Sequence, residues 1–129
     1  MDLMRRASLL VALLTGLLYV SPALTAQAPS RIIAIGDIHG SIDGLTTILK
    51  ATGLIDGSHA WTGGKATLMQ TGDYMDRGEQ TRAVLDLLMA LETQAATAGG
   101  RATSLLGNHE VMNLIGENRD VTREIYADR

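Results

Sequence analysis

The sequence predicts an α/β fold in which parallel strands alternate with helices. Three short apolar runs, at residues 31–35, 66–71 and 102–106, each end in a Gly-Asp or Gly-Asn pair. Two longer stretches with helical spacing of apolar residues lie between these runs. Strands that alternate with helices of about ten or more residues form right-handed βαβ units. The expected order is therefore strand, helix, strand, helix, strand.

The first strand and helix have clear boundaries. Residues 31–35 form a β-branched apolar run that ends at Gly36, which is typical of a buried strand. Ser41 is suited to cap a helix that follows, and Gly53 marks its expected end. The apolar positions on one face of this helix are Ile42, Leu45, Ile48 and Leu49.

A turn-rich connection and a second βα unit come next. Residues 56–64 contain three glycines and indicate a loop, after which residues 66–71 form the second strand. Residues 80–97 show helical spacing and are followed by a pair of glycines, which favours a helix end there.

The last part of the chain contains the third strand, at residues 102–106, and a short helix after Asn108. The final stretch, residues 116–129, is polar and has no stop signal. We expect this stretch to be the end of a truncated reading frame.

Residues 1–26 are expected to be a secretory signal peptide rather than part of the fold. Two arginines precede an apolar stretch at residues 7–20, and small residues follow it. That stretch is shorter than the about 20 residues that a bilayer-spanning helix needs, so a retained membrane anchor is the weaker alternative. We expect cleavage after Ala26, or else after Ala28, and export, in a bacterium to the periplasm. Residues 27–129 would then form one small domain.

Composition excludes several function classes. The net charge is −3 and there is no basic run, so nothing supports a nucleic-acid or anionic-lipid partner. The chain has no cysteine, which excludes disulfides, thiolate metal sites and a cysteine nucleophile. Neither a P-loop nor a dinucleotide-binding glycine pattern follows any predicted strand.

The residues that carry chemistry follow the three predicted strands. Parallel strands bring their carboxyl ends to one edge of the sheet, where open α/β sheets bind ligands. Taken singly, such residues are common turn formers, but three ordered motifs predict a metal centre made by Asp37, His39, Asp73 and Asn108. Carboxylates can bridge two divalent ions. The motifs are GDIHG at 36–40, GDYMDRG at 72–78 and GNHE at 107–110.

In this order and spacing, the motifs resemble those of the calcineurin-like metallophosphoesterases, in the form found in phosphoprotein phosphatases. The segments at residues 61–64 and 70–71 are most similar to the bacterial Shewanella-like protein phosphatases. The resemblance covers residues 32–114. It implies that residues 27–129 are the N-terminal part of a β-sandwich flanked by helices, in βαβαβ order, with the C-terminal half of the domain absent.

The resemblance implies a hydrolase that uses two divalent ions, which would be Mn, Fe or Zn. Asp37 and His39 would bind the first ion, Asp73 would bridge both, and Asn108 would bind the second. The two ions would activate a water to the hydroxide that attacks phosphorus. In this family the second ion takes further ligands from later segments, so the second site is incomplete in this chain.

Three further residues receive catalytic roles from the resemblance. His109 would protonate the leaving oxygen, Asp76 would hold His109, and Arg77 would grip the phosphate. A guanidinium fork matches phosphate oxygens as a lysine does not. Outside such a motif, adjacent Asp76 and Arg77 would more commonly be a solvated surface pair. Glu110 is expected to orient its neighbours or to cap a helix rather than to bind metal.

Two functions follow from these expectations. The first is a metal-dependent phosphatase acting on a phosphorylated protein, at serine, threonine or tyrosine, or on a small phosphoester. The second is a truncated, non-catalytic fragment that binds a single divalent ion. No stable membrane anchor is expected after signal cleavage, and the oligomeric state is left open.

Overall fold

The computed structural model describes residues 30–127 of the chain. The expected signal peptide, residues 1–26, lies outside the described residues. None of the helices in the described part is both long and apolar enough to cross a membrane. The elements, in chain order, are β1 (Ile32–Ile35), α2 (Ile42–Ala51), β2 (Thr67–Gln70), α3 (Thr81–Thr97), β3 (Arg101–Ser104), α4 (Asn108–Leu114) and α5 (Arg123–Ala127).

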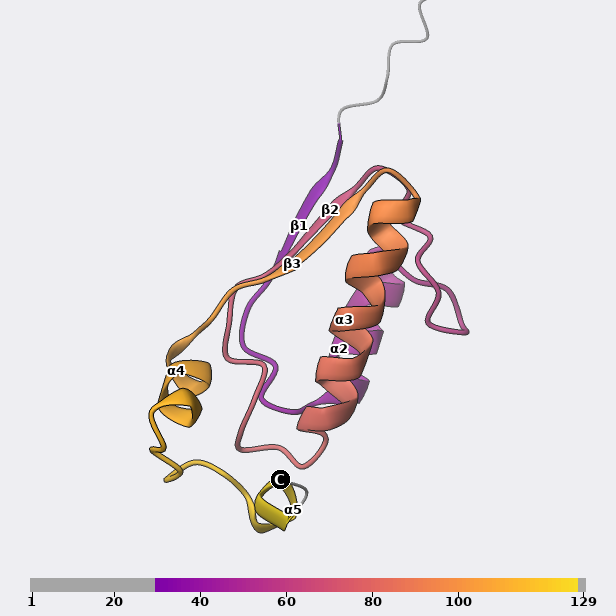
Figure 1. The fold of residues 1–129 in the computed structure, drawn as a ribbon. Coiled ribbons are helices and arrows are strands. Elements are labelled where there is room, and N and C mark those ends of the chain that lie inside the picture. The colour runs from indigo at the N-terminus through magenta and orange to yellow at the C-terminus, as the bar shows by residue number, and fades with distance from the viewer. Residues whose placement is uncertain (1–29, 128–129) are drawn as a thin grey trace, which may run out of the picture.

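The three strands form one parallel sheet in the order β1, β2, β3. In its register Ile33 lies beside Leu68, and Leu68 lies beside Ala102. Both crossovers step in the same direction along the sheet, and right-handed crossovers of this kind place their helices on one face. Figure 1 shows α2 and α3 together on that face. The expected α/β fold with parallel strands is confirmed.

The core lies between the sheet and the two helices. Leu45 and Leu49 of α2 and Val84 and Leu91 of α3 are completely buried there. The predicted apolar face of α2 is right at Ile42, Leu45 and Leu49 and wrong at Ile48, which is 40% exposed. A short helix against one neighbour buries a narrow stripe, and Ile48 lies at its margin. The side chains that make up the central cluster include Ile35, Leu45, Leu49, Leu54, Leu68, Val84, Leu88 and Leu91.

Helix boundaries follow the local signals. Ser41 caps α2 as predicted, because its hydroxyl accepts a hydrogen bond from the Gly44 N–H at 3.2 Å. Helix α3 ends at Thr97, and Gly99 then has a φ of 78°, the left-handed conformation common after a helix. In the loop before β2, the Trp61 indole donates to the Gly64 carbonyl at 3.0 Å.

The third strand differs from the prediction. It spans Arg101–Ser104, whereas the apolar pattern predicted residues 102–106. Leu105 still donates its N–H to the Gln70 carbonyl, but Leu105 and Leu106 are 44% and 61% exposed. The chain leaves the sheet at this point to enter the third motif, so hydrophobicity alone overestimated the strand.

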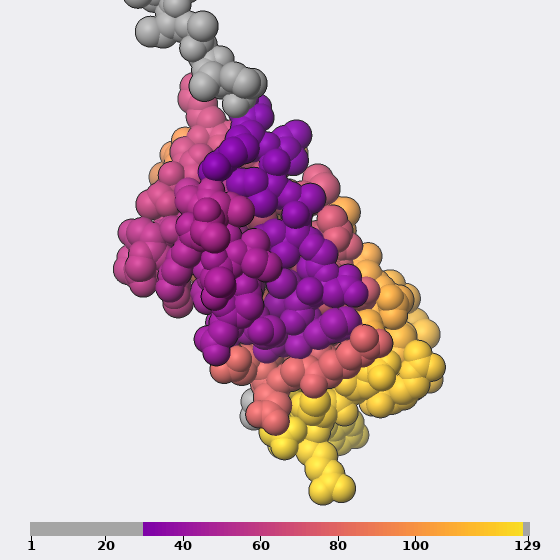
Figure 2. Space-filling view, turned by 180° about the vertical axis from the view of Figure 1, so that it is seen from behind, coloured from indigo at the N-terminus to yellow at the C-terminus, as the bar shows by residue number. Residues whose placement is uncertain are grey.

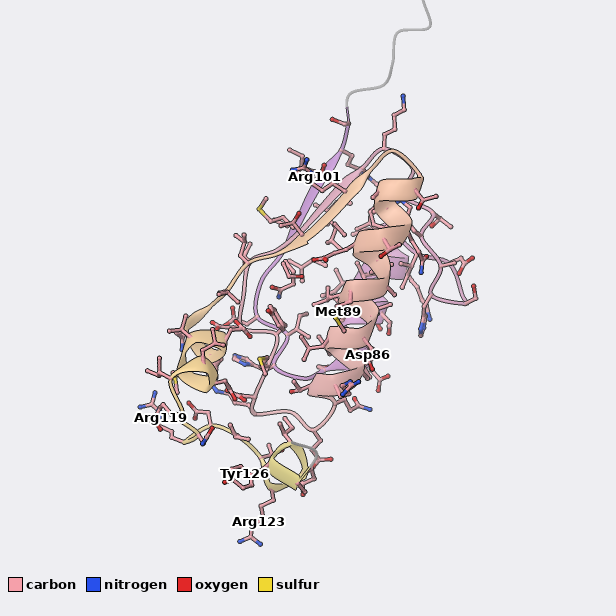
Figure 3. All side chains as sticks on the ribbon, viewed as in Figure 1. Asp86, Met89, Arg101, Arg119, Arg123 and Tyr126 are labelled. Carbon is pink, nitrogen blue, oxygen red and sulfur yellow. The ribbon has the colours of Figure 1, made fainter. Side chains whose placement is uncertain are left out.

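The C-terminal segment contains a helix that the sequence did not predict. Helix α5 buries Ile125, while Tyr126 is 64% exposed and projects outward with Arg123 (Figure 3). Just before α5, the Asp120 carbonyl accepts a hydrogen bond from the Arg77 N–H at 3.0 Å. Figure 2 shows this segment, in yellow, against the part of the chain near residue 80. The Thr122 hydroxyl also accepts from the Ile125 N–H at 3.4 Å, so this polar stretch combines a local bond at the start of α5 with a tertiary contact.

Candidate active site

The first and second motifs run side by side at the carboxyl edge of the sheet. The backbone N–H groups of Ile38 and His39 both donate to the Asp73 carbonyl at 3.0 Å. The Gly40 N–H donates to the Tyr74 carbonyl at 2.9 Å. Two motifs separated by more than 30 residues in sequence are thereby joined by main-chain bonds, as the parallel sheet predicted.

Glu110 ties the third motif to the second. Its carboxylate is only 3% exposed and accepts hydrogen bonds from three consecutive N–H groups, those of Asp73 at 2.7 Å, Tyr74 at 3.1 Å and Met75 at 3.1 Å. It also accepts from the Gly107 N–H at 2.8 Å. This confirms the expectation that Glu110 orients its neighbours.

Gln70 ties the second motif to the first, a role that sequence analysis missed. Its side chain is completely buried at the end of β2, where it donates to the Gly36 carbonyl at 2.8 Å and the Gly72 carbonyl at 3.1 Å. Its amide oxygen accepts from the Gly72 N–H. All polar groups at this point are therefore paired. A polar residue at a strand position that should face the core was the available signal.

The backbone at the site is strained. His39, Asp73, Asp76 and Arg77 have positive φ values of 47°, 56°, 63° and 60°. In residues 30–127, the only other non-glycine residue with a positive φ is His59. Each such conformation costs about 1–2 kcal/mol for a side-chain-bearing residue. Strain of this kind clusters at functional sites, because the surrounding bonds must hold it in place.

The imidazole of His39 is oriented for a ligand. Its Nδ1 lies 3.1 Å from the Met75 carbonyl oxygen, which can only accept, so Nδ1 carries the proton. Its Nε2 is therefore left with a lone pair, 3.7 Å from the Asp37 carboxylate and 3.4 Å from an Arg77 guanidinium nitrogen. Metal-ligating histidines commonly have this arrangement, with the second nitrogen donating to a carbonyl.

His109 and Asp76 form a buried pair. Their side chains are 2% and 1% exposed, and the His109 Nδ1 lies 3.2 Å from the Asp76 Oδ2. The His109 backbone N–H donates to the Asp73 Oδ1 at 3.0 Å. The rings of His39 and His109 meet edge to face, with centroids 4.7 Å apart. The structure thus brings together the residues expected to form the acid and its support.

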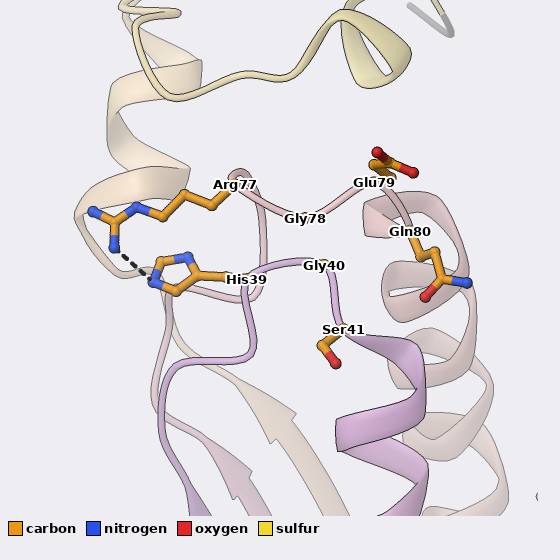
Figure 4. Close-up of a pocket in the computed structure, with 7 residues that line it drawn as sticks. All are labelled: His39, Gly40, Ser41, Arg77, Gly78, Glu79 and Gln80. Atoms are coloured by element: carbon orange, nitrogen blue, oxygen red, sulfur yellow. Dashed lines mark hydrogen bonds between the residues drawn. The ribbon is translucent and has the colours of Figure 1, made fainter.

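An open pocket of about 400 Å³ lies beside these groups. Figure 4 shows Arg77 and His39 reaching toward each other at one side of it, with the start of α2 at the other. This pocket offers a cation and an imidazole to a ligand. The residues that line it are His39, Gly40, Ser41, Arg77, Gly78, Glu79 and Gln80.

The predicted metal ligands are only partly assembled. Asp37 lies beside His39, and Asp73 is held between the second and third motifs, whereas Asn108 is exposed and its Nδ2 lies 3.8 Å from the Met112 sulfur. Within residues 30–127, no group of three His, Asp or Glu side chains is arranged to hold an ion. The oxygen and imidazole donors and the His39 tautomer fit a divalent ion, so the four-ligand assignment stays a prediction.

One ionisable group beside the site has a shifted pKa. Burial raises the pKa of the Tyr74 phenol, and the carboxylates of Glu110 and Glu92 raise it further. The phenol therefore stays neutral at all physiological pH values and adds no charge to the site.

Comparison with known proteins shows that this chain is similar to parts of several phosphatases. A sequence profile of the calcineurin-like phosphoesterases matches residues 30–128. Shewanella-like protein phosphatase 2 of Arabidopsis thaliana is 42% identical over 108 residues, which is 79% of this chain and 28% of that protein. Shewanella-like protein phosphatase 1 of Plasmodium berghei is 41% identical over 86 residues, which is 67% of this chain and 24% of that protein.

The fold is also similar to that of a solved phosphatase structure. The crystal structure of the cold-active protein-tyrosine phosphatase of a psychrophilic Shewanella species superposes with a TM-score of 0.74 and 38% sequence identity. The match covers 77% of this chain and 30% of that one. The chain therefore spans less than a third of the length of each of these three proteins.

Proposed function

The chain belongs to the calcineurin-like phosphoesterase family, and we propose that it carries the N-terminal catalytic half-site of a metal-dependent protein phosphatase. The single observation that supports this most is the convergence of two imidazoles at one sheet edge. The unprotonated Nε2 of His39 lies 3.7 Å from the Asp37 carboxylate, His109 is paired with Asp76, and the two rings are in contact.

In this proposal four residues of the site are metal ligands. Asp37, His39, Asp73 and Asn108 would hold two divalent ions, with manganese as the first to test. When bound, the ions would supply Lewis acidity, which lowers the pKa of water toward neutrality. The chain's own contribution is to hold oxygen and nitrogen donors at one edge before any ion arrives. The bonds made by Glu110 support that arrangement.

His109 acts as the proton donor in this scheme. Its Nδ1 is bound to Asp76, so Nε2 is the nitrogen that can carry a proton to the leaving oxygen. As the bond between phosphorus and that oxygen breaks, the oxygen takes the proton and leaves as an alcohol or phenol. Arg77, at the edge of the open pocket, supplies two parallel N–H donors for the phosphoryl oxygens.

The substrate class proposed is a phosphorylated side chain on a protein. An open pocket admits a phosphate carried on a bulky partner, and the relatives are named as protein phosphatases, one of them a tyrosine phosphatase. Phosphotyrosine, phosphoserine and phosphothreonine peptides, assayed in parallel with manganese, distinguish the preferred residue. Turnover of none of them, with a small phosphoester hydrolysed, would contradict the protein-substrate part of the proposal.

A second candidate function is binding of a single ion without turnover. It is supported by the gathering of ligands in the described residues, which is pairwise rather than fourfold. We expect residues 27–129 to bind at most one Mn²⁺ tightly. We expect their phosphatase activity to be at least about a hundredfold below that of a full-length enzyme that has all ligands of both ions, because loss of ligands or of their support commonly costs that much.

Titration calorimetry with Mn²⁺ and an assay with para-nitrophenyl phosphate test this expectation together. His39→Ala should remove the tight site, and His59→Ala, a histidine outside all three motifs, is the matched control. Two tight ions and near-normal turnover in residues 27–129 would show that the chain is a self-sufficient enzyme.

We further propose that the protein is exported and that residues 1–26 are removed. The order of basic residues, short apolar stretch and small residues supports this. Expression of the whole chain in a bacterial host should yield a periplasmic product whose intact mass begins at Gln27. A product that retains Met1 in the membrane fraction would contradict the proposal.

A further inference from the structure

We propose that Asn113 is a positioning residue that holds the Asp76 carboxylate in the orientation that fixes His109. This inference rests on the proposed function, in which His109 donates a proton to the leaving oxygen. It concerns a residue outside the three motifs, contributed by the second turn of α4 (Asn108–Leu114).

The geometry joins three side chains at one oxygen. Asn113 lies four residues after His109, so both occupy the same face of α4. Its Nδ2 donates to the Asp76 Oδ2 at 2.6 Å and to the His109 backbone carbonyl at 2.9 Å. The His109 Nδ1 meets the same Asp76 Oδ2 at 3.2 Å. Both partners of the Asn113 nitrogen are acceptors only, which settles which end of the amide faces them.

The other oxygen of Asp76 explains why this contact matters. Asp76 is completely buried, and its Oδ1 has no hydrogen-bond partner among the described residues. The carboxylate is therefore oriented through Oδ2 alone, where the shortest bond comes from Asn113. Without that donor, the carboxylate can turn about its last torsion angle, and the imidazole loses a fixed partner.

The consequence for catalysis is a dependence on the leaving group. A good leaving group such as para-nitrophenolate departs with little need of a proton, whereas phenolate needs one. Loss of Asn113 should therefore slow hydrolysis of phenyl phosphate more than that of para-nitrophenyl phosphate. We expect the ratio of the two kcat values to change by about tenfold, which is less than the about hundredfold or more that a fully positioned acid contributes, because His109 itself remains.

The first test reads the His109 ring directly and requires no turnover. In the ¹⁵N-labelled chain, we expect the His109 Nδ1–H proton to give a slowly exchanging signal, because the ring is 2% exposed. Asn113→Asp keeps the side-chain shape but replaces the donor with an acceptor next to Asp76. That variant should lose the signal or exchange it at least about tenfold faster.

Two further variants keep this test decisive. Val111→Ala, on the exposed side of the same helix, should leave the signal unchanged. If circular dichroism shows that Asn113→Asp does not fold, Asn113→Ala takes its place, because it adds no charge beside Asp76. The same Nδ1–H signal is then measured in that variant. An unchanged Nδ1–H signal in a folded Asn113 variant would overturn the proposal.

The second test is kinetic and uses a form of the protein that hydrolyses para-nitrophenyl phosphate. A role limited to packing predicts that Asn113→Ala slows both esters equally, and that result would overturn the assignment. A protein without phosphatase activity at any length would contradict the proposed function instead, and the ring signal would then decide the role of Asn113 by itself.

Discussion

Replacing Glu110 with glutamine is expected to lower the free energy of unfolding of the chain by about 3 kcal/mol, because buried N–H donors lose their acceptor. Glu110 accepts four backbone N–H groups with two oxygens, and a glutamine offers one oxygen and an NH₂ group that faces donors. Urea denaturation followed by circular dichroism measures the change. The strained second motif should loosen at the same time, so Mn²⁺ affinity should also fall.

Glu92→Gln is the matched control for this prediction, since Glu92 is exposed on α3. It should change the unfolding free energy by less than about 0.5 kcal/mol. The Glu110 variant should also lower the pKa of Tyr74 toward its ordinary value, and by more than Glu92→Gln does, because Glu110 has the larger effect of the two charges that raise it. A Glu110→Gln chain as stable as the unaltered chain would show that the carboxylate does not hold the motifs together.

Replacing Asp73 with asparagine should weaken Mn²⁺ binding at least about a hundredfold and abolish turnover in the active protein, since a bridging ligand loses its charge toward both ions. Asparagine retains an oxygen that can accept the His109 N–H, so the fold should survive. The loss should exceed that caused by Asn108→Ala, which affects one ion only. Titration calorimetry and a para-nitrophenyl phosphate assay provide the two measurements.

The control for Asp73 is Asp86→Asn on α3. Asp86 pairs with Arg82 at 3.0 Å, both side chains are exposed, and Asp86 lies on the outer side of the helix (Figure 3). The Asp86→Asn substitution should leave Mn²⁺ binding and turnover unchanged. Equal Mn²⁺ affinity in the Asp73→Asn chain and the unaltered chain would refute the bridging assignment.

Glu110 and Asp73 belong to one arrangement of three motif loops at the sheet edge. The site holds four non-glycine residues with positive φ. This conformation is locally unfavourable, so these residues would normally relax out of it unless other bonds held them. Glu110 and Gln70 oppose that relaxation by joining all three motifs through buried hydrogen bonds. The loops are therefore ordered by the chain itself, which reduces the reorganisation needed when a ligand binds.

The sequence by itself determined the local elements and their order. Periodicity and capping residues located β1, α2, β2 and α3 to within one or two residues, because these signals act over a few neighbours. The alternation of strands and helices then implied a parallel sheet, and with it the meeting of the three motifs at one edge. The resemblance to calcineurin-like phosphoesterases, drawn from those motifs, is confirmed.

Only the tertiary structure decided which residues outside the three motifs support the site. Gln70 and Asn113 act through partners more than 30 residues away, and the Asp120 carbonyl before α5 accepts from the Arg77 N–H, so no local pattern identifies these partners. The same applies to the end of β3, where the chain leaves the sheet for the third motif although its hydrophobic pattern continues. Such features depend on bonds between segments, and those bonds exist only once the sheet has brought the segments together.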